Sequence, residues 1–337
     1  MTRRAALATV LAGTAILGAL LAAFAIGRYP IGPSDLALVL WAKATGTSHG
    51  LPPTVETVIF GVRGPRVLGA LAIGAALAAA GAAYQSLFRN PLVSPDILGV
   101  SAGSAVGAVL GIFLSQPVVV IQALAFVGGL AAVALVYMVA NAVRGHDPLL
   151  VLVLAGVVIG ALGGAIIALV KYLADPYNQL PAITFWLLGS LAAATPGDVA
   201  TAMPAVLIGL LPLFLLRWRI NVLALGDEEA RALGVEATVV RTVVIAAATL
   251  MTAAAVSIAG IVGWVGLLVP HLARLVAGPE FSRLLPTSVA FGSAFLLGVD
   301  TLARSLARIE IPLGVLTAFV GTPLFLWQLV VARRSWQ

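Results

Sequence analysis

Long stretches without a charged residue divide this 337-residue chain and constrain its fold more than any other feature. A helix that crosses about 30 Å of hydrocarbon needs about 20 predominantly apolar residues. Counting these stretches gives ten crossings, so the expected fold class is all-α, a polytopic membrane protein. The stretches are Ala5 to Gly27, Val67 to Phe88, Ile97 to Ser115, Val118 to Val143, Pro148 to Val170, Val199 to Leu216, Thr242 to Ala259, Val262 to Pro270 with an extension toward Ala277, Leu284 to Val299, and Ile311 to Ala332.

Composition excludes a soluble fold. Hydrophobic residues make up 61% of the chain and charged residues 9%, whereas soluble domains have about 45–50% and about 25%. The chain has no cysteine and three histidines, which excludes disulfides, thiolate metal sites and thiol catalysis and nearly excludes a poly-histidine metal site. We therefore expect no resident metal or cofactor. The basic residues lie scattered between apolar stretches, which argues against a nucleic-acid partner and for a lipid bilayer.

Ten crossings place both ends of the chain on one side of the membrane, and the positive-inside rule tests which side that is. With loops assigned alternately, twelve of the 19 Lys and Arg residues fall on the side of the termini and seven on the other. We predict cytoplasmic termini, with residues 28–57 and 171–198 outside. Four of the seven outer bases crowd at helix ends, Arg63 with Arg66 and Arg304 with Arg308, and orientation alone does not explain them.

The first apolar stretch leaves an alternative open. Arg3 and Arg4 precede it, and small residues close it around Ala22 and Ala25, as in a secretory signal peptide. The apolar part of a signal peptide is about 7–15 residues long. This stretch is longer, so we favour an anchored first helix.

Three segments outside the crossings are predicted to contain short helices. Ser34 to Lys43 is a capped apolar stretch ended by Gly46, and Pro181 to Ala193 is opened by a proline. The third segment, residues 220–240, carries Asp227, Glu228 and Glu229 where a helix dipole favours acids, with Gly234 placed to end the turn. This segment is either a solvated connector or a docking helix for a cytoplasmic partner, and its acids on a face rich in arginine favour docking.

Glycine and proline patterns indicate how the helices pack. Glycines 99, 103, 107 and 111, and glycines 156, 160 and 164, form two small-residue seams that we expect to face neighbouring helices. Two segments, Arg89 to Pro95 and Gly260 to His271, are both interrupted by Pro or Gly and both lead into a short helix. Such paired interruptions predict two halves of inverted topology around a central pathway.

At this point an ordered set of motifs resembles a known family, the transmembrane permeases of type II ABC importers for iron–siderophore complexes, haem and cobalamin. The resemblance covers the chain from about Arg63 to the C-terminus. The motifs are Arg63-Gly64-Pro65-Arg66, Gln85 with Arg89-Asn90-Pro91-Leu92, Leu98 to Gly103, Leu225-Gly226 with Ala230 to Gly234, Gly263 to Leu267, Pro270 to Arg274, Asp300 with Arg304, Ile311 to Gly314, and Gly321 to Pro323.

The resemblance implies a single transmembrane permease domain over residues 1–337, located in a bacterial cytoplasmic (inner) membrane. It also implies a set of partners: a second copy of the chain, two cytoplasmic ABC ATPase subunits, a periplasmic substrate-binding protein and a metal-chelate substrate. Iron chelates are the commoner cargo of the family, so we expect a ferric siderophore or haem, with cobalamin as the alternative.

The resemblance further implies roles for three groups of residues. The outer arginines Arg63, Arg66 and Arg304 would dock acidic lobes of the binding protein. A constriction at the inner end of the pathway would fall at Asn90, Pro91 and Leu92, with a second near His146 and Asp147. Gly64 departs from the family, which usually has a bulky residue there, and a glycine could loosen the second helix. The ATPase coupling residues would be Leu225, Gly226, Asp227, Glu228, Glu229, Ala230, Arg231, Ala232, Leu233 and Gly234.

Two rival classes fit the sequence less well. A membrane enzyme needs a catalytic constellation, but the acids at the edges of the crossings, such as Asp300 and Glu310, look isolated, and His271 has no second histidine nearby. We therefore expect no catalytic residue. An ion-coupled secondary transporter usually keeps an ionisable residue deep in a crossing, and the charge-free stretches contain none. A P-loop is also absent from the sequence, so ATP hydrolysis would have to reside in a partner chain.

Overall fold

The computed structural model describes residues 3–27, 29–143 and 148–332, and its regular elements are all helices. They are α1 (Arg3–Ala25), α2 (Pro33–Thr45), α3 (Pro53–Glu56), the π-helix η1 (Thr57–Arg63), α4 (Gly64–Leu87), the 3-10 helix η2 (Pro95–Leu98), α5 (Val100–Phe113), α6 (Val118–Ala142), α7 (Pro148–Leu173), α8 (Gln179–Leu188), α9 (Pro196–Leu215), α10 (Arg217–Leu223), α11 (Asp227–Ala232), α12 (Ala237–Ala259), α13 (Val265–Ala277), α14 (Phe281–Ser305) and α15 (Leu313–Ala332).

Each of the ten predicted crossings coincides with a helix, and the all-helical, polytopic fold class is confirmed. Over the ranges that the structure describes, seven helical spans are long and apolar enough to cross a bilayer. Of the remaining three predicted crossings, α5 and α13 are shorter apolar helices that follow the interruptions at Pro95 and Gly263, and α15 spans Leu313–Ala332.

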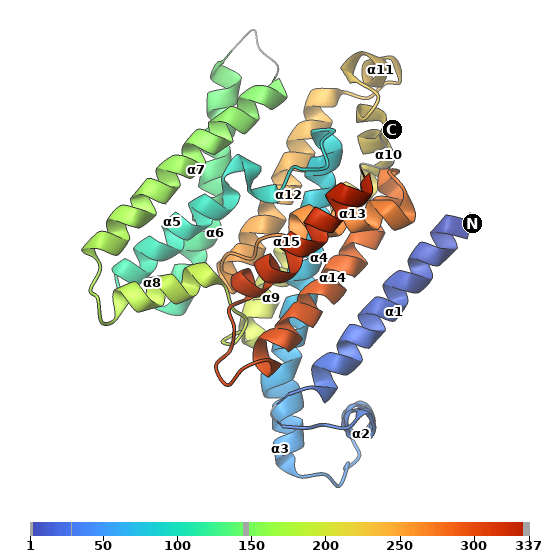
Figure 1. Ribbon diagram of the computed structural model, residues 1–337, viewed down its shortest axis with the longest axis vertical. Coiled ribbons are helices and arrows are strands. Elements are labelled where there is room, and N and C mark those ends of the chain that lie inside the picture. Colours follow the sequence, from blue (N-terminus) through green and yellow to red (C-terminus); the bar gives the residue numbers. More distant parts are fainter. Residues whose placement is uncertain (1–2, 28, 144–147, 333–337) are drawn as a thin grey trace.

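The non-crossing segments gather at the two ends of the bundle (Figure 1). The helices α2 and α3 lie at one end, which we call the α2 end. The helices α10 and α11 lie at the opposite end, which we call the α11 end, and α1 begins and α15 finishes toward it (Figure 1). This arrangement agrees with the predicted placement of residues 28–57 and 220–240 on opposite sides of the membrane.

The helix α4 forms the centre of the bundle, with 89% of its most apolar window buried. Its sequence is dominated by alanine and glycine, so the backbones of neighbouring helices approach closely. Gly74 of α4 faces Gly292 of α14, and a methyl group on either would overlap the carbonyl of the other. Because lipid supplies no hydrophobic drive for helix association, this contact is a main source of cohesion between α4 and α14.

The substitution Gly292→Ala is therefore expected to destabilise the protein by about 1–3 kcal/mol, the usual cost of overpacking a close contact. Gly298 lies on the same helix, and a methyl group there would meet nothing within 4 Å. Gly298→Ala is the matched control, and we expect it to be neutral or slightly stabilising. Thermal unfolding in detergent measures both variants, and equal unfolding temperatures would contradict the proposed packing.

The structure corrects both glycine seams. Gly103, Gly107 and Gly111 of α5 each pack against α6, whereas Gly99, with φ +78°, precedes α5 and lies against α7. Of the seam on α7, Gly156 packs against Ile97, but methyl groups at Gly160 and Gly164 would meet nothing within 4 Å. The prediction that α7 uses all three glycines inside the bundle is therefore wrong, because α7 packs against α5 at Gly163, whereas methyl groups at Gly160 and Gly164 would point into open space.

The short helices are confirmed with changed boundaries. The helix α2 begins at Pro33 and is ended by Gly46, which has φ +70°. The helix α8 ends at Leu188 instead of continuing to Ala193, because Gly189 adopts φ +74° there. Gly64 does not interrupt the second crossing, since helical structure continues from Pro53 to Leu87. A methyl group at Gly64 would approach the Ile59 carbonyl to 2.8 Å, so the π-helical turn of η1 requires a glycine at this position.

Candidate functional site

The arginines predicted at the outer end meet in one cluster at the α2 end, where two of them bind the last turn of α1. Arg63 donates hydrogen bonds to the carbonyls of Phe24 and Tyr29, and Arg304 donates to the carbonyl of Ala23. The last carbonyls of a helix lack partners within the helix, and cations are favoured there. Arg63 is only 5% exposed. These two side chains therefore fasten α1, whose most apolar window is only 11% buried, to the rest of the bundle.

The third arginine, Arg66, lies between two carboxylates. Its Nε is 2.8 and 3.0 Å from the two oxygens of Asp300, and its Nη1 is 3.0 Å from Oε2 of Glu310. Asp300 is 1% exposed, and Nε of Arg304 lies 3.7 Å from its second oxygen. Arg66 is bidentate toward Glu310, through Nη1 and Nη2, and shares its Nε–H between the two oxygens of Asp300; both contacts are charge-assisted, which is the strong form of a hydrogen bond. Arg66 therefore joins α4 to α14 and to the residues that precede α15.

Sequence reasoning described Asp300 and Glu310 as isolated acids, and the structure shows that this description is wrong. Both are paired with Arg66, which lies 234 and 244 positions away in the sequence. The signal that could have suggested the pairing is their predicted location, since all three residues fall at the outer edges of predicted crossings. The three arginines and two acids together carry a net charge of only +1.

A cavity of about 440 Å³ lies beside this cluster. Arg63, Arg66 and Arg304 all line it, together with Glu310. An acidic group that entered this cavity would meet three guanidinium groups, one of which already holds Glu310. The remaining lining residues are Gly27, Tyr29, Val58 and Val62.

The two interrupted segments meet near the middle of the bundle. Pro95 of η2 packs against Gly266 in the first turn of α13, and a methyl group on Gly266 would lie 2.5 Å from the proline ring. Gln85 of α4, which is buried, donates from Nε2 to the carbonyl of Leu267 at 3.0 Å. An irregular backbone at membrane depth needs such internal partners. Both interruptions are thus held against α4.

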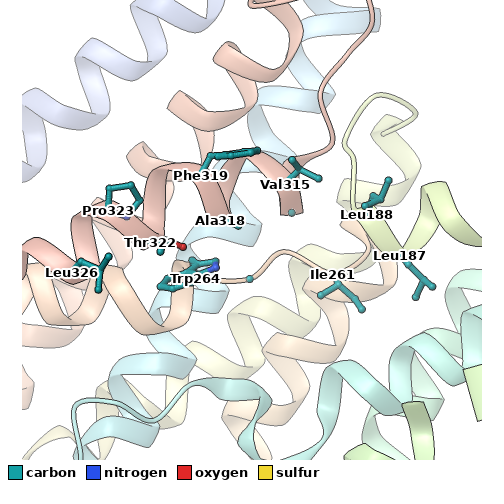
Figure 2. Close-up of a pocket in the computed structure, with 12 residues that line it drawn as sticks. Leu187, Leu188, Ile261, Trp264, Val315, Ala318, Phe319, Thr322, Pro323 and Leu326 are labelled. Carbon is teal, nitrogen blue, oxygen red and sulfur yellow. The ribbon is translucent and has the colours of Figure 1, made fainter. Parts of the chain in front are cut away.

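An open apolar groove of about 820 Å³ runs beside the second interruption. Figure 2 shows α15 along one side, the segment containing Ile261 and Trp264 along the other, and Leu187 and Leu188 of α8 at one end. Trp264 has φ +70°, an unusual conformation for a residue with a side chain. Its ring is fixed edge-on against Phe325 at 6.0 Å. The polar side chain in the lining is Thr322, so the groove offers mainly apolar contact. The lining also includes Gly263, Gly314, Val315, Ala318, Phe319, Pro323 and Leu326.

The turn predicted as an inner constriction follows α4. Asn90 Oδ1 accepts a hydrogen bond from the backbone N–H of Leu92 at 2.9 Å, and the N–H of Asn90 reaches the carbonyl of Gln85 at 3.1 Å. The asparagine side chain beside Pro91 thus accepts a hydrogen bond from a backbone N–H that would have no partner where α4 ends. Leu92 is 55% exposed. His146 and Asp147, the predicted second constriction, lie outside the residues that the structure describes.

The predicted coupling segment forms two short helices at the α11 end. Asp227, Glu228 and Glu229 occupy the first turn of α11. Gly234 has φ +75°, and the N–H of Val235 bonds to the carbonyl of Ala230 at 2.8 Å. These features form a Schellman-type helix end, as predicted. The side chains of Leu225 and Leu233 are 62% and 53% exposed beside these acids.

The residues that the structure describes contain no group of three or more His, Cys, Asp or Glu side chains that could hold a metal ion. The candidate site described above is a set of surfaces and turns along a helix bundle.

Comparison with known proteins matches this chain to transport proteins. The FecCD transport family matches residues 15–331. A molybdate import system permease protein of Haemophilus influenzae is 40% identical over 89% of this chain and 88% of its own length. A cobalamin import system permease protein of Halobacterium salinarum is 41% identical over 86% and 77%. A solved structure of a metal-chelate type ABC transporter in an inward-facing conformation is 35% identical, with a TM-score of 0.86 over 95% of this chain and 98% of that one.

Proposed function

Because this chain belongs to the FecCD transport family, we propose that it forms the pathway through which a binding-protein-dependent importer brings a ferric siderophore or haem into the cytoplasm. The chain is a membrane-spanning permease subunit of an ABC importer, and the ATPase is a separate chain. The proposal rests on the observation that two different surfaces lie at opposite ends of the helix bundle. An arginine-lined cavity lies at the α2 end, and an acidic, partly apolar coupling segment lies at the α11 end. Figure 1 shows that these two ends are opposite each other.

The apolar groove beside α15 supports a large, partly apolar cargo. A chelate of this kind slides along a wall of Leu, Ile, Val and Phe without being held by a charge, whereas a small oxyanion would find few partners there. Cobalamin is the alternative cargo, since it is also large and partly apolar. An ion-coupled transporter fits less well, because Asp300, a carboxylate buried at the end of a crossing, is already paired with Arg66.

A second copy of the chain is the proposed partner within the membrane, so that the pathway lies between two identical subunits. Several apolar side chains beside the groove are unusually exposed, including Phe319 at 74% and Trp327 at 55%. Methyl groups at Gly160 and Gly164 of α7 would also meet nothing within 4 Å in the chain. A two-fold axis between subunits would cover these surfaces and double the arginine cluster. The proposed location is the bacterial inner membrane with both termini in the cytoplasm.

The proposed function is tested by asking whether a periplasmic binding protein docks at Arg63, Arg66 and Arg304. Val62 lines the same cavity and is 58% exposed, and the chain has no native cysteine. We expect Val62→Cys, once labelled with a bulky maleimide, to lose binding-protein-stimulated ATP hydrolysis while basal hydrolysis continues. The unlabelled variant is the control, and its stimulation should weaken as salt rises. Full stimulation after complete labelling would place the docking surface elsewhere.

The inner constriction at Asn90, Pro91 and Leu92 gives a further prediction. The Leu92 side chain projects from a turn held by its own hydrogen bonds, so truncating it removes bulk without releasing the turn. We expect Leu92→Ala to raise the ATP-independent leak of small solutes from proteoliposomes severalfold. Leu114→Ala removes an equally exposed leucine from the other end of α5 and is the matched control. An unchanged leak would assign the seal to the region of His146 and Asp147.

A further inference from the structure

The coupling segment is too short to hold its own shape. The helices α10 and α11 have seven and six residues, and isolated helices shorter than about 12 residues are marginal in water. Their geometry must therefore come from attachments to the bundle. Among the residues that the structure describes, side-chain hydrogen bonds attach these helices to two different long helices.

The first attachment joins α11 to α12. The guanidinium of Arg241, in the first turns of α12, faces the carboxylate of Asp227: Nη1 donates to Oδ2 at 2.9 Å, and Nη2 donates to Oδ1. The Arg241 side chain is 16% exposed and that of Asp227 is 40% exposed. Two parallel hydrogen bonds fix the relative orientation of the groups as well as their distance. A movement of α11 is therefore passed to α12.

The second attachment joins α10 to α14. Asn221 Oδ1 accepts a hydrogen bond from the backbone N–H of Phe281 at 2.7 Å, and Nδ2 donates to the Ser282 hydroxyl at 3.3 Å. Phe281 is the first residue of α14, and the N–H groups in the first turn of a helix have no partner within it. Asn221 thus caps α14 from another helix.

A glycine with an unusual backbone conformation lies between the two attachments. Gly226, between α10 and α11, has φ +137° and ψ 164°, a conformation that residues with side chains avoid. On either side of it, Leu223 and Ala230 are buried, so each short helix is held to the bundle independently. Both α12 and α14 pack against α4 at the centre of the bundle.

We propose that Arg241 and Asn221 are positioning residues that carry the motion of the ATPase from this segment into α12 and α14. The proposal rests on the proposed function of residues Leu225 to Gly234 as the ATPase-coupling surface. It adds that the surface acts through two separate attachments, one to each of two helices that flank α4. Neither residue needs to touch the ATPase.

The test compares assembly, ATP hydrolysis and uptake in proteoliposomes that contain the permease with its ATPase and binding protein. We expect Arg241→Ala and Asn221→Ala to assemble and to hydrolyse ATP, but to lose about tenfold in substrate taken up per ATP hydrolysed, as expected when one partner of a partly buried contact is removed. Lys43→Ala, which breaks the Lys43–Glu56 ion pair at the α2 end, is the control for a general effect of losing an ion pair.

Conservative variants separate transmission from a structural role. Asn221→Asp keeps the acceptor for Phe281 and should restore most of the uptake per ATP, and so should the charge swap of Asp227→Arg with Arg241→Asp. If Arg241→Ala does not assemble, the charge-swapped variant is decisive. Recovery of uptake per ATP in that variant supports the proposal. A charge-swapped variant that assembles but has low uptake per ATP overturns it. Uptake per ATP within twofold of wild type in both alanine variants also overturns it.

A cross-link distinguishes this proposal from the function on which it rests. Leu233→Cys, in an otherwise cysteine-free chain, should cross-link to the ATPase in wild-type and variant backgrounds alike. Cross-linking with unchanged coupling would overturn only the roles of Arg241 and Asn221. Absence of any cross-link in the wild-type background would overturn the coupling surface itself, and the present proposal with it.

Discussion

Replacement of Arg66 by alanine is expected to cost the protein more stability than any other single change at the α2 end. Asp300 is 1% exposed; it accepts hydrogen bonds from Nε of Arg66, while Nε of Arg304 lies 3.7 Å away. Removing one member of a buried ion pair costs about 3–5 kcal/mol, and Arg66→Ala would leave Asp300 with only the longer contact to Arg304. We expect Arg66→Ala to unfold at a clearly lower temperature in detergent than the wild-type protein does.

Two further variants identify the cause. Removing both charges, in Arg66→Ala with Asp300→Ala, should recover part of the lost stability, because contacting residues are not additive. Glu310→Gln should cost much less than Arg66→Ala, since the Glu310 side chain is 27% exposed. An Arg66→Ala protein as stable as wild type would show that these ion pairs are not formed in the folded molecule.

The second large effect is expected at Gly234. Its φ of +75° is unavailable to proline, whose ring fixes φ near −65°, and proline would also remove the N–H that bonds to the Arg231 carbonyl. The end of α11 would be redirected, and the exposed Leu233 beside it would be displaced. We expect Gly234→Pro to leave the permease in the membrane but to reduce ATP-driven uptake by at least about tenfold, by loss of the coupling geometry.

Asparagine provides the matched control at this position. It tolerates the left-handed conformation better than other residues with side chains, and a Cβ atom at residue 234 would meet nothing within 4 Å. Gly234→Asn should therefore transport nearly as well as wild type. Equal uptake by the proline and asparagine variants would show that the segment is a solvated connector, the alternative to a docking helix that the sequence also allowed.

Local features of this molecule could be predicted from sequence because short-range physics determines them. Charge-free stretches located the crossings, Gly46 and Gly234 marked helix ends, and the asparagine beside Pro91 indicated the hydrogen-bonded turn that the structure contains. In each case the residues that interact lie within a few positions of one another. Helix geometry and backbone hydrogen bonding are then sufficient to make the prediction.

The contacts that organise the candidate site could not be predicted in this way. Arg66 and Asp300 are 234 positions apart, and Asn221 and Phe281 are 60 apart. No periodicity relates such residues, and any of the acids at the α2 end could have been the partner. The same reason explains the error at Gly160 and Gly164, since a seam of small residues shows that close packing is possible without showing which helix fills it.

ATP-driven uptake of a labelled ferric siderophore into proteoliposomes tests the central claim most directly. The vesicles would hold the permease and its ATPase, with ATP inside and the binding protein outside, and parallel samples would use haem and cobalamin. We expect accumulation only when the ATPase, ATP and the binding protein are all present. Accumulation driven by a proton or sodium gradient without the ATPase would contradict the account.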